Sequence, residues 1–319
     1  MELVLASILL VIGFALLIKG ANYTISGASS LALKFRISAI VIGLTVVSFG
    51  TSAPELVVNV MAALKGNVDI SYGNIIGSNI INILLILGVS SVIRPLYAQR
   101  GTIRREIPFS LLAVLALAIM SNDALLSGGK NILARNDGMI LLMFFLIFIV
   151  YTFALPKIEV EELPDVDETS PVKIIFLIII GFTGLFLGGR LVVKNAVILA
   201  EHFGMSDRVI GLTVVAIGTS LPELVTSAVA AKQNKVEIAI GNVVGSNICN
   251  ILLILGITSI IQPLPFQNQT NIDLMVLVVA SAALFFSVYI GRNHRINQWE
   301  GVIFLFFYTS YTLYLLLWG

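Results

Sequence analysis

A stretch of 55 residues occurs twice in this chain, and the two copies align without a gap. Residues 42–96 match residues 210–264 at a constant offset of 168, with 34 identities in 55 positions. Shared apolar composition alone does not produce so many identities. Because repeated units bury their faces against one another, the duplication predicts a fold built from two related halves, with any shared site between them.

Composition places these halves in a membrane. The chain is 58% hydrophobic and 12% charged, with a mean hydropathy of +1.01, whereas a soluble domain carries about 25% charge. Apolar runs close to the ~20 residues that cross a bilayer recur along the whole length. We expect an all-α, multi-pass integral membrane protein of the cell membrane, with the lipid bilayer as its partner. The net charge of +1 says nothing about nucleic acid, but the sequence has no basic patch with interleaved aromatic residues, so we expect no nucleic acid partner.

The apolar runs predict ten transmembrane helices, five in each half. The expected spans are 3–19, 37–64, 72–94, 106–121, 138–155, 172–189, 206–232, 240–262, 272–290 and 299–317. Because five is odd, the second half must cross the membrane in the opposite sense. We therefore expect two inverted-topology five-helix repeats, residues 1–155 and 172–319, with broken helices at the midplane. The run Leu3–Ile18 lacks a basic flank, so we expect a first span rather than a cleaved signal.

The distribution of Lys and Arg predicts the orientation. With both termini outside, 13 of the 19 Lys and Arg residues are cytoplasmic and 6 are external, as the positive-inside rule favours. The segment 156–171 is then an acidic cytoplasmic linker. Its dense charge and proline favour a solvated, mobile connection; a calcium-sensing loop is disfavoured because the spacing of an EF-hand is absent.

Polar residues within the apolar runs carry the functional signal. The first repeated motif reads Gly-Thr-Ser-x-Pro-Glu, at residues 50–55 and 218–223. Proline inside a span lacks an N–H and displaces the carbonyl four residues earlier, which here belongs to a glycine, so we expect an unwound turn between two half-helices. Glu55 and Glu223 then lie near a helix start, where the dipole favours a carboxylate.

The oxygens of this motif suit a hard cation. Two carboxylates, main-chain carbonyls and Thr and Ser hydroxyls resemble the 6–8 oxygens that Ca²⁺ prefers. The hydroxyls belong to Thr51, Thr219, Ser52 and Ser220. Zinc or copper is disfavoured, because Cys249 is the only cysteine and both histidines lie outside the repeated core. Cys249 can form no intrachain disulfide, and we interpret it as a small core residue.

The second repeated motif reads Gly-Asn-x-x-Gly-Ser-Asn-x-x-Asn, at residues 73–82 and 241–250. Ser78 and Asn82 share one helix face because they are four residues apart, and Ser246 and Asn250 do the same. Gly73 and Gly77 form a small surface for close helix approach. A packing groove explains these glycines better than a ligand site does. It explains less well the hydroxyl and amide side chains, and a purely structural role for two buried glutamates is disfavoured.

Together, the paired motifs resemble the α-repeats of the sodium/calcium exchanger branch of the calcium/cation antiporter superfamily, across nearly the whole chain. The resemblance implies that Glu55 and Glu223 bind the transported Ca²⁺ and Na⁺, joined by main-chain oxygens at Thr51 and Thr219. It further implies that outer sodium sites are completed by Ser78 and Ser246 with the backbone around Ser48 and Ala216. Asn82 and Asn250 would flank the central site.

One departure refines the expectation. Several relatives carry aspartate where Asn250 stands, and in potassium-dependent members that aspartate is linked to potassium use. Asparagine here favours a potassium-independent antiporter that exchanges Na⁺ for Ca²⁺ by alternating access and is electrogenic. No cofactor and no enzymatic activity are expected, and we expect the chain to work as a monomer, although the sequence leaves the oligomeric state open.

Three rival functions remain at this stage. Two close carboxylates can share protons, so an H⁺/Ca²⁺ antiporter keeps the same fold. The acidic motif of the proton-coupled exchangers, however, is absent from this chain. An intramembrane enzyme would need a nucleophile with a base or a catalytic acid pair, and neither motif contains His. A channel is also conceivable, but opposed repeats with broken helices suit alternating access better.

Overall fold

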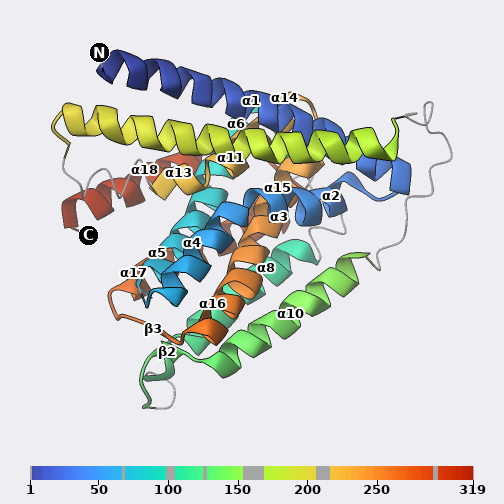
Figure 1. Cartoon of the computed structure of the whole chain (residues 1–319). Helices are drawn as coiled ribbons and strands as arrows, with labels where there is room; N and C mark the ends of the chain where they lie inside the picture. Colours follow the sequence, from blue (N-terminus) through green and yellow to red (C-terminus); the bar gives the residue numbers. More distant parts are fainter. Residues whose placement is uncertain are drawn as a thin grey trace.

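The structure, a computed structural model, describes residues 2–66, 69–97, 105–124, 128–153, 169–205, 216–289 and 294–318. Within these ranges the chain is a bundle of helices with four two-residue strands (Figure 1). The first half contains α1 (Glu2–Phe35), α2 (Ala39–Ile42), the π-helical η1 (Gly43–Val47), α3 (Ser48–Thr51), α4 (Ala53–Leu64), α5 (Asp69–Ile80), the π-helical η2 (Ile81–Ile86), α6 (Leu87–Ile93), β1 (Leu96–Tyr97), α8 (Glu106–Met120), β2 (Ile132–Leu133) and α10 (Arg135–Phe153).

The second half repeats this order in the described residues. It contains α11 (Pro171–His202), α13 (Ala216–Thr219), α14 (Leu221–Lys232), α15 (Val236–Ile248), the π-helical η4 (Cys249–Leu255), α16 (Gly256–Ile261), β3 (Leu264–Pro265), α17 (Thr270–Tyr289), β4 (Arg295–Ile296) and α18 (Gln298–Trp318). The elements that carry the repeated motifs, α3 to α6 and α13 to α16, therefore correspond in order between the halves.

Seven helices are long and apolar enough to cross a membrane, and an eighth span results if the bent pair 39–51 and 53–64 is counted as one. These eight coincide with eight of the ten spans expected from the sequence. The expected span 106–121 coincides with α8, which has 15 residues. The expected span 206–232 begins at residues outside the described ranges. The protein is thus a helical membrane protein, and the number ten stays a prediction.

Helices α1 and α11 are much longer than the sequence predicts. The expected spans 3–19 and 172–189 are wrong at their C-terminal ends, because α1 continues to Phe35 and α11 to His202. The first span was expected to end at Lys19. Here Gly20 is instead a packing residue: a Cβ on it would lie 2.7 Å from the Leu185 amide nitrogen.

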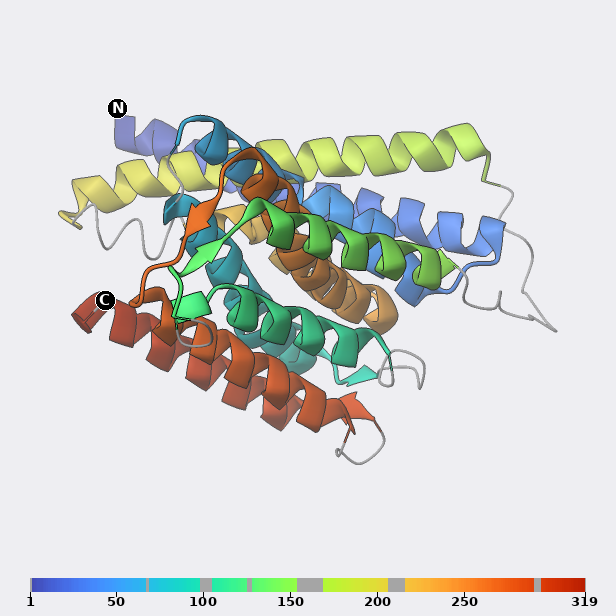
Figure 2. The same ribbon diagram turned by 90° about the horizontal axis from the view of Figure 1, so that it is seen from below.

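Glycines bring α1 and α11 into backbone contact along one side of the bundle (Figures 1 and 2). A Cβ on Gly20 would lie 2.8 Å from the carbonyl oxygen of Gly181, and one on Gly188 would lie 2.8 Å from the carbonyl oxygen of Gly13. Rising residue numbers in α1 therefore face falling numbers in α11. The two helices run antiparallel, at a separation that larger side chains would prevent.

Two small sheets tie the halves together. Strand β1 pairs antiparallel with β4, with Leu96 opposite Ile296, and β2 pairs antiparallel with β3, with Leu133 opposite Leu264. Each sheet takes one strand from each half of the chain. Leu96 and Leu264 differ by the repeat offset of 168, so each copy of the repeat ends in a strand that pairs with the other half.

The first proline motif bends its helix. Helices α3 and α4 meet at 47° across Ser52, and Pro54 lies in the first turn of α4, where a missing N–H costs nothing. The expected break into two half-helices is confirmed, and the break is confined to Ser52. The Ser52 amide donates to the Ser48 carbonyl oxygen at 2.9 Å, and the Leu56 amide donates to the Ser52 carbonyl oxygen at 3.1 Å. The helical hydrogen bonds are therefore nearly continuous through the bend.

The motif glycines serve close packing rather than unwinding. Gly50 stays helical within α3, and a Cβ there would overlap the ring of Phe182 in α11. In the second copy, a Cβ on Gly218 would collide with the side chain of Val193, which also lies in α11. Helix α11 thus lies directly against both proline breaks, which places the two motifs beside the long helix pair.

Candidate cation-binding site

The two glutamates of the proline motifs are buried in the interior of the bundle. Glu55 in the first turn of α4 is 1% exposed, and Glu223 in the first turn of α14 is 2% exposed. Neither forms an ion pair within the part of the chain that the structure describes. Their charges lie close enough to repel each other. Two buried carboxylates without a cationic side chain are costly, so a cation from outside the chain is the natural way to neutralise them.

The proline motif of one half contacts the glutamate of the other. The Ser52 hydroxyl donates to Oε1 of Glu223 at 3.1 Å. The corresponding bond in the other half is absent: neither Glu55 oxygen accepts a hydrogen bond from a described residue, although Thr219 lies near enough to stabilise its charge, and the Ser220 hydroxyl has no described partner. The two halves therefore build one region whose hydrogen bonds are incomplete on one side.

The second motif lies on two matching helices, each with an irregularity at its asparagine. Asn82 lies in η2, and Asn250 lies in η4. Such π-helical insertions occur frequently at functional sites, since the widened turn redirects side chains. Segment η4 packs against α4, which carries Glu55, and η2 packs against α14, which carries Glu223. The asparagine of each half is thus delivered beside the glutamate-bearing helix of the other half.

Several buried oxygen atoms in this region accept no hydrogen bond from any described residue. They are both carboxylate oxygens of Glu55, Oε2 of Glu223, the hydroxyl oxygens of Ser220 and Ser246, and the Oδ1 atoms of Asn82 and Asn250. Buried acceptors are normally satisfied. This set combines two carboxylates with neutral oxygens, and among the described residues no three His, Cys, Asp or Glu side chains gather elsewhere. A set of unused oxygens suits a hard cation such as Ca²⁺ or Na⁺.

The structure also shows the surroundings of the other residues that the sequence analysis selected. Thr51 is buried, and its hydroxyl donates to Oδ1 of Asn242 at 3.1 Å, while Ser78 is buried and Thr219 is half-buried. Ser48 is also buried, and its carbonyl oxygen accepts from the Ser52 amide at 2.9 Å. The Thr51 hydroxyl lies 3.2 Å from the same oxygen, but its single proton can serve either this carbonyl or Asn242, not both.

Ala216 begins α13, and its side chain lies outside the described residues. The position of Ala216 at the start of α13 matches that of Ser48 at the start of α3.

Sequence reasoning missed a set of supporting amides. Asn242 donates to the Ser227 hydroxyl at 3.0 Å and lies 3.4 Å from the Glu223 carbonyl oxygen. In the first half, Asn59 donates to the Glu55 carbonyl at 2.8 Å. Both asparagines hold the helix turn that carries a glutamate. The signal was present for Asn242, which belongs to the second repeated motif, but its partner could not be inferred from one copy.

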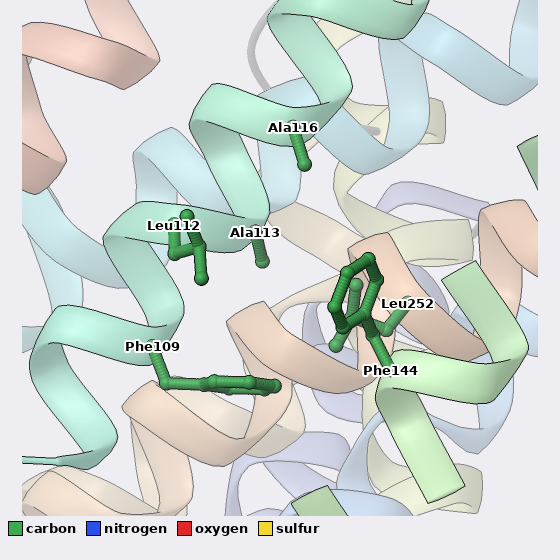
Figure 3. A pocket seen from close by; sticks show the side chains of 6 residues that line it. All are labelled: Phe109, Leu112, Ala113, Ala116, Phe144 and Leu252. Carbon is green, nitrogen blue, oxygen red and sulfur yellow. The ribbon is translucent and has the colours of Figure 1, made fainter. Parts of the chain in front are cut away.

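Cavities flank the site on the α11 side. One of about 300 Å³ is lined by Thr51, Pro54 and Phe182, among others, and one of about 380 Å³ by Thr219, Pro222 and Arg190, among others. A third cavity of about 70 Å³ lies between α8, α10 and η4 and is lined only by apolar side chains (Figure 3). Its lining offers no side-chain oxygen to a cation, so the third cavity is no alternative site.

Duplicated motifs that bring buried oxygens without hydrogen-bond partners among the described residues into a helical membrane protein are typical of one class, the cation transporters. Comparison with known proteins narrows the class. The family described as sodium/calcium exchanger protein matches residues 5–154 and again residues 173–317. The chain therefore belongs to the sodium/calcium exchanger family.

Relatives and solved structures agree with this assignment. The chain is 37% identical to the putative antiporter CaxA of Alkalimonas amylolytica, covering 97% of this chain and 98% of that protein. It is 32% identical to the sodium/calcium exchanger MaX1 of Methanosarcina acetivorans, covering 97% of each. Its fold matches the solved sodium-calcium exchanger NCX_Mj with a TM-score of 0.84 and 34% identity, covering 99% of this chain and 100% of that one.

Proposed function

We propose that this protein is a secondary active antiporter that exchanges Na⁺ for Ca²⁺ across the cell membrane by alternating access. The observation that carries the proposal is the set of buried oxygens without hydrogen-bond donors around Glu55 and Glu223. Proton coupling would need only the glutamates, whereas hydroxyl and amide oxygens are good ligands for Na⁺ and Ca²⁺. Exchanger relatives across the whole chain length support the same cargo.

Charge balance explains why the two ions exchange. The two glutamates give the site a charge of −2, which one Ca²⁺ or two Na⁺ neutralise. An empty charged site resists enclosure in a medium of low dielectric constant, so the site changes sides only when it is loaded. A third Na⁺ would leave a net charge of +1 and make the exchange electrogenic.

The neutral amide of Asn250 supports independence from potassium. An amide offers a carbonyl oxygen but no charge with which to hold K⁺ beside Ca²⁺. We therefore propose that K⁺ is neither required nor transported.

The contacts between the long helices support an inverted topology. Adding 168 to one partner of the Gly20–Gly181 contact and subtracting 168 from the other gives Gly188 and Gly13, which are also in contact. Pairs that exchange in this way are what a two-fold axis between antiparallel helices produces. This supports two inverted repeats, 1–155 and 172–319, with the site at the midplane and ten spans in all.

Orientation and assembly are part of the same proposal. The 13-to-6 cationic bias supports both termini outside and a cytoplasmic linker at 156–171, of which residues 156–168 lie outside the described ranges. Single cysteines at 165 and 297 in a Cys249→Ala background should both be protected from an impermeant external thiol reagent. External labelling at position 165 would reverse the orientation. A single chain contains both halves of the site, so a monomer suffices.

Uptake of ⁴⁵Ca²⁺ into reconstituted vesicles tests the function. Vesicles loaded with Na⁺ should accumulate calcium when diluted into Na⁺-free medium, whereas vesicles loaded with K⁺ or choline should not. An interior-negative or interior-positive potential set by valinomycin should change the rate if exchange is electrogenic. If a pH gradient without Na⁺ drives uptake as well as the Na⁺ gradient, the H⁺/Ca²⁺ antiporter replaces this proposal.

A further inference from the structure

The two ligand amides of the second motif are each bonded to an asparagine of the other half. Asn250 donates through Nδ2 to Oδ1 of Asn79 at 2.9 Å, and Asn82 donates through Nδ2 to Oδ1 of Asn247 at 3.0 Å. All four residues are at most 1% exposed. Asn79 and Asn247 differ by the repeat offset, as do Asn82 and Asn250, so the two bonds are equivalent and cross between the halves in opposite directions.

These bonds determine which end of each ligand amide, the NH₂ group or the Oδ1 oxygen, is left without a partner. Because the NH₂ groups of Asn82 and Asn250 are occupied, the atoms that remain are their Oδ1 oxygens, and neither oxygen has a partner among the described residues. An asparagine side chain rotated by half a turn would offer NH₂ instead. The exposed atom would then be a donor, which repels a cation.

A backbone group fixes the side-chain orientation in one of these two hydrogen-bonded asparagine pairs. The NH₂ of Asn79 lies 3.5 Å from the carbonyl oxygen of Asn247, a long hydrogen bond. A carbonyl oxygen can only accept, so it directs the NH₂ of Asn79 toward itself and the oxygen of Asn79 toward Asn250. In the other pair, Asn82 and Asn247, the NH₂ of Asn247 has no partner in the described part of the structure. The Asn79–Asn250 pair is therefore the more firmly oriented one.

We propose that Asn79 and Asn247 are positioning residues that hold Asn250 and Asn82 with their carbonyl oxygens toward the cation. The inference rests on the proposed function, because it assumes that those oxygens receive the transported ion. Residues of this kind, one step removed from the ion, orient ligands and commonly change metal affinity when altered. The need for such residues follows from chemistry: an amide has a wrong face, whereas a carboxylate, with two oxygens, has none.

A rescue experiment distinguishes orientation from a merely structural role. In Asn79→Leu the amide of Asn250 loses its acceptor and can rotate, so calcium affinity should fall by roughly 10- to 100-fold. Adding Asn250→Asp to the same protein should restore binding, because either rotamer of aspartate presents an oxygen. Asn250→Asp alone measures the gain from the added charge, and the positioning role requires that Asn79→Leu cost affinity when Asn250 is unchanged but little or none in the Asn250→Asp background.

Two further variants control the measurement. Asn79→Asp keeps an oxygen acceptor for the NH₂ of Asn250 and should retain most of the affinity. Asn195→Leu removes an equally buried amide whose NH₂ is bonded only to the Leu191 carbonyl of its own helix, at 2.7 Å; it should leave calcium affinity unchanged. Affinity is measured by equilibrium dialysis of ⁴⁵Ca²⁺ in Na⁺-free buffer after size-exclusion chromatography.

The outcomes separate this inference from the proposed function. If the unmodified protein binds no calcium, the proposed function fails. If it binds and Asn79→Leu binds equally well, or if Asn250→Asp brings no recovery, the positioning role is refuted. Should Asn79→Leu fail to fold, infrared spectra of protein labelled with ¹³C-asparagine provide the test: calcium should shift an amide carbonyl band that Asn250→Asp removes, and no shift would overturn the inference.

Discussion

The two copies of the repeat are nearly the same in sequence but differ in their contacts. In the second copy, Gly241 and Gly245 are buried against the first half, and a Cβ on Gly245 would lie 2.5 Å from the Leu44 carbonyl oxygen. In the first copy, Gly73 is exposed and Gly77 half-buried, and no described residue lies within 4 Å of a Cβ built on either. The contact is described in one copy only, because the counterparts of residues 40–48 at the repeat offset, 208–216, lie almost entirely outside the described ranges.

The described contacts of the two copies also differ at the glutamates. Ser52 of the first copy is bonded to Glu223, whereas Ser220 of the second copy leaves Glu55 without a hydrogen bond from the described residues. Identical motifs in an inverted pair should form identical contacts if the molecule were symmetric. Alternating access requires the opposite, because one side must be closed while the other is open. We interpret the asymmetry as one of the two states of the proposed transport cycle.

The largest expected effect should be the same for both copies. Glu55→Gln and Glu223→Gln each leave one carboxylate to balance a divalent ion, so each variant should lose Na⁺-driven ⁴⁵Ca²⁺ uptake entirely. Glu201→Gln changes an exposed glutamate on α11 and should retain normal uptake. Size-exclusion profiles in detergent verify folding. Normal exchange by either site variant would remove that glutamate from the site.

A smaller effect should separate the two copies. Gly245→Ala places a methyl group against a backbone oxygen and the Ser48 hydroxyl, at 2.5 and 2.6 Å, so it should destabilise the protein by about 1–3 kcal/mol through overpacking. Gly77→Ala meets no described residue, and alanine favours a helix by up to about 1 kcal/mol over glycine, so it should be neutral or stabilising. Thermal unfolding in detergent provides the comparison, and equal losses from both substitutions would mean that Gly77 is packed as closely as Gly245.

The smallest effect concerns the hydroxyls in the absence of cations. Ser52→Ala removes a hydrogen bond to a carboxylate, worth about 1.5–3 kcal/mol before the protein relaxes, whereas Ser220→Ala removes a hydroxyl without a described partner. In choline buffer with chelator, Ser52→Ala should therefore lower the melting temperature more than Ser220→Ala does. A larger loss for Ser220→Ala would mean that the asymmetry around the glutamates is the reverse of that described here.

The repeat in the sequence was sufficient to predict the family and the helical membrane class, whereas the ligand roles of the site residues stay predictions. Glu55, Glu223, Asn82 and Asn250 could be found because duplicated polar residues in apolar runs are rare without a function. The roles of Asn79 and Asn247 could not be found, because each is bonded to the other half and a single copy does not reveal its partner.

Element boundaries were less predictable for a physical reason. The extension of α1 beyond Lys19 depends on its packing against α11, and the glycine pattern in each helix is ambiguous until both are placed together. The π-helical segments η2 and η4 were likewise invisible, since a single inserted residue hardly changes the apolar periodicity of a buried helix. Tertiary contacts, rather than local propensity, decide both features.

The central claim is that the two copies build one cation site rather than one each. Equilibrium dialysis of ⁴⁵Ca²⁺ against the purified protein in Na⁺-free buffer tests it most directly. The account predicts a single high-affinity Ca²⁺ per chain, lost completely in Glu55→Gln and equally in Glu223→Gln, and displaced by added Na⁺. Two Ca²⁺ per chain, with each variant retaining one of them, would contradict it.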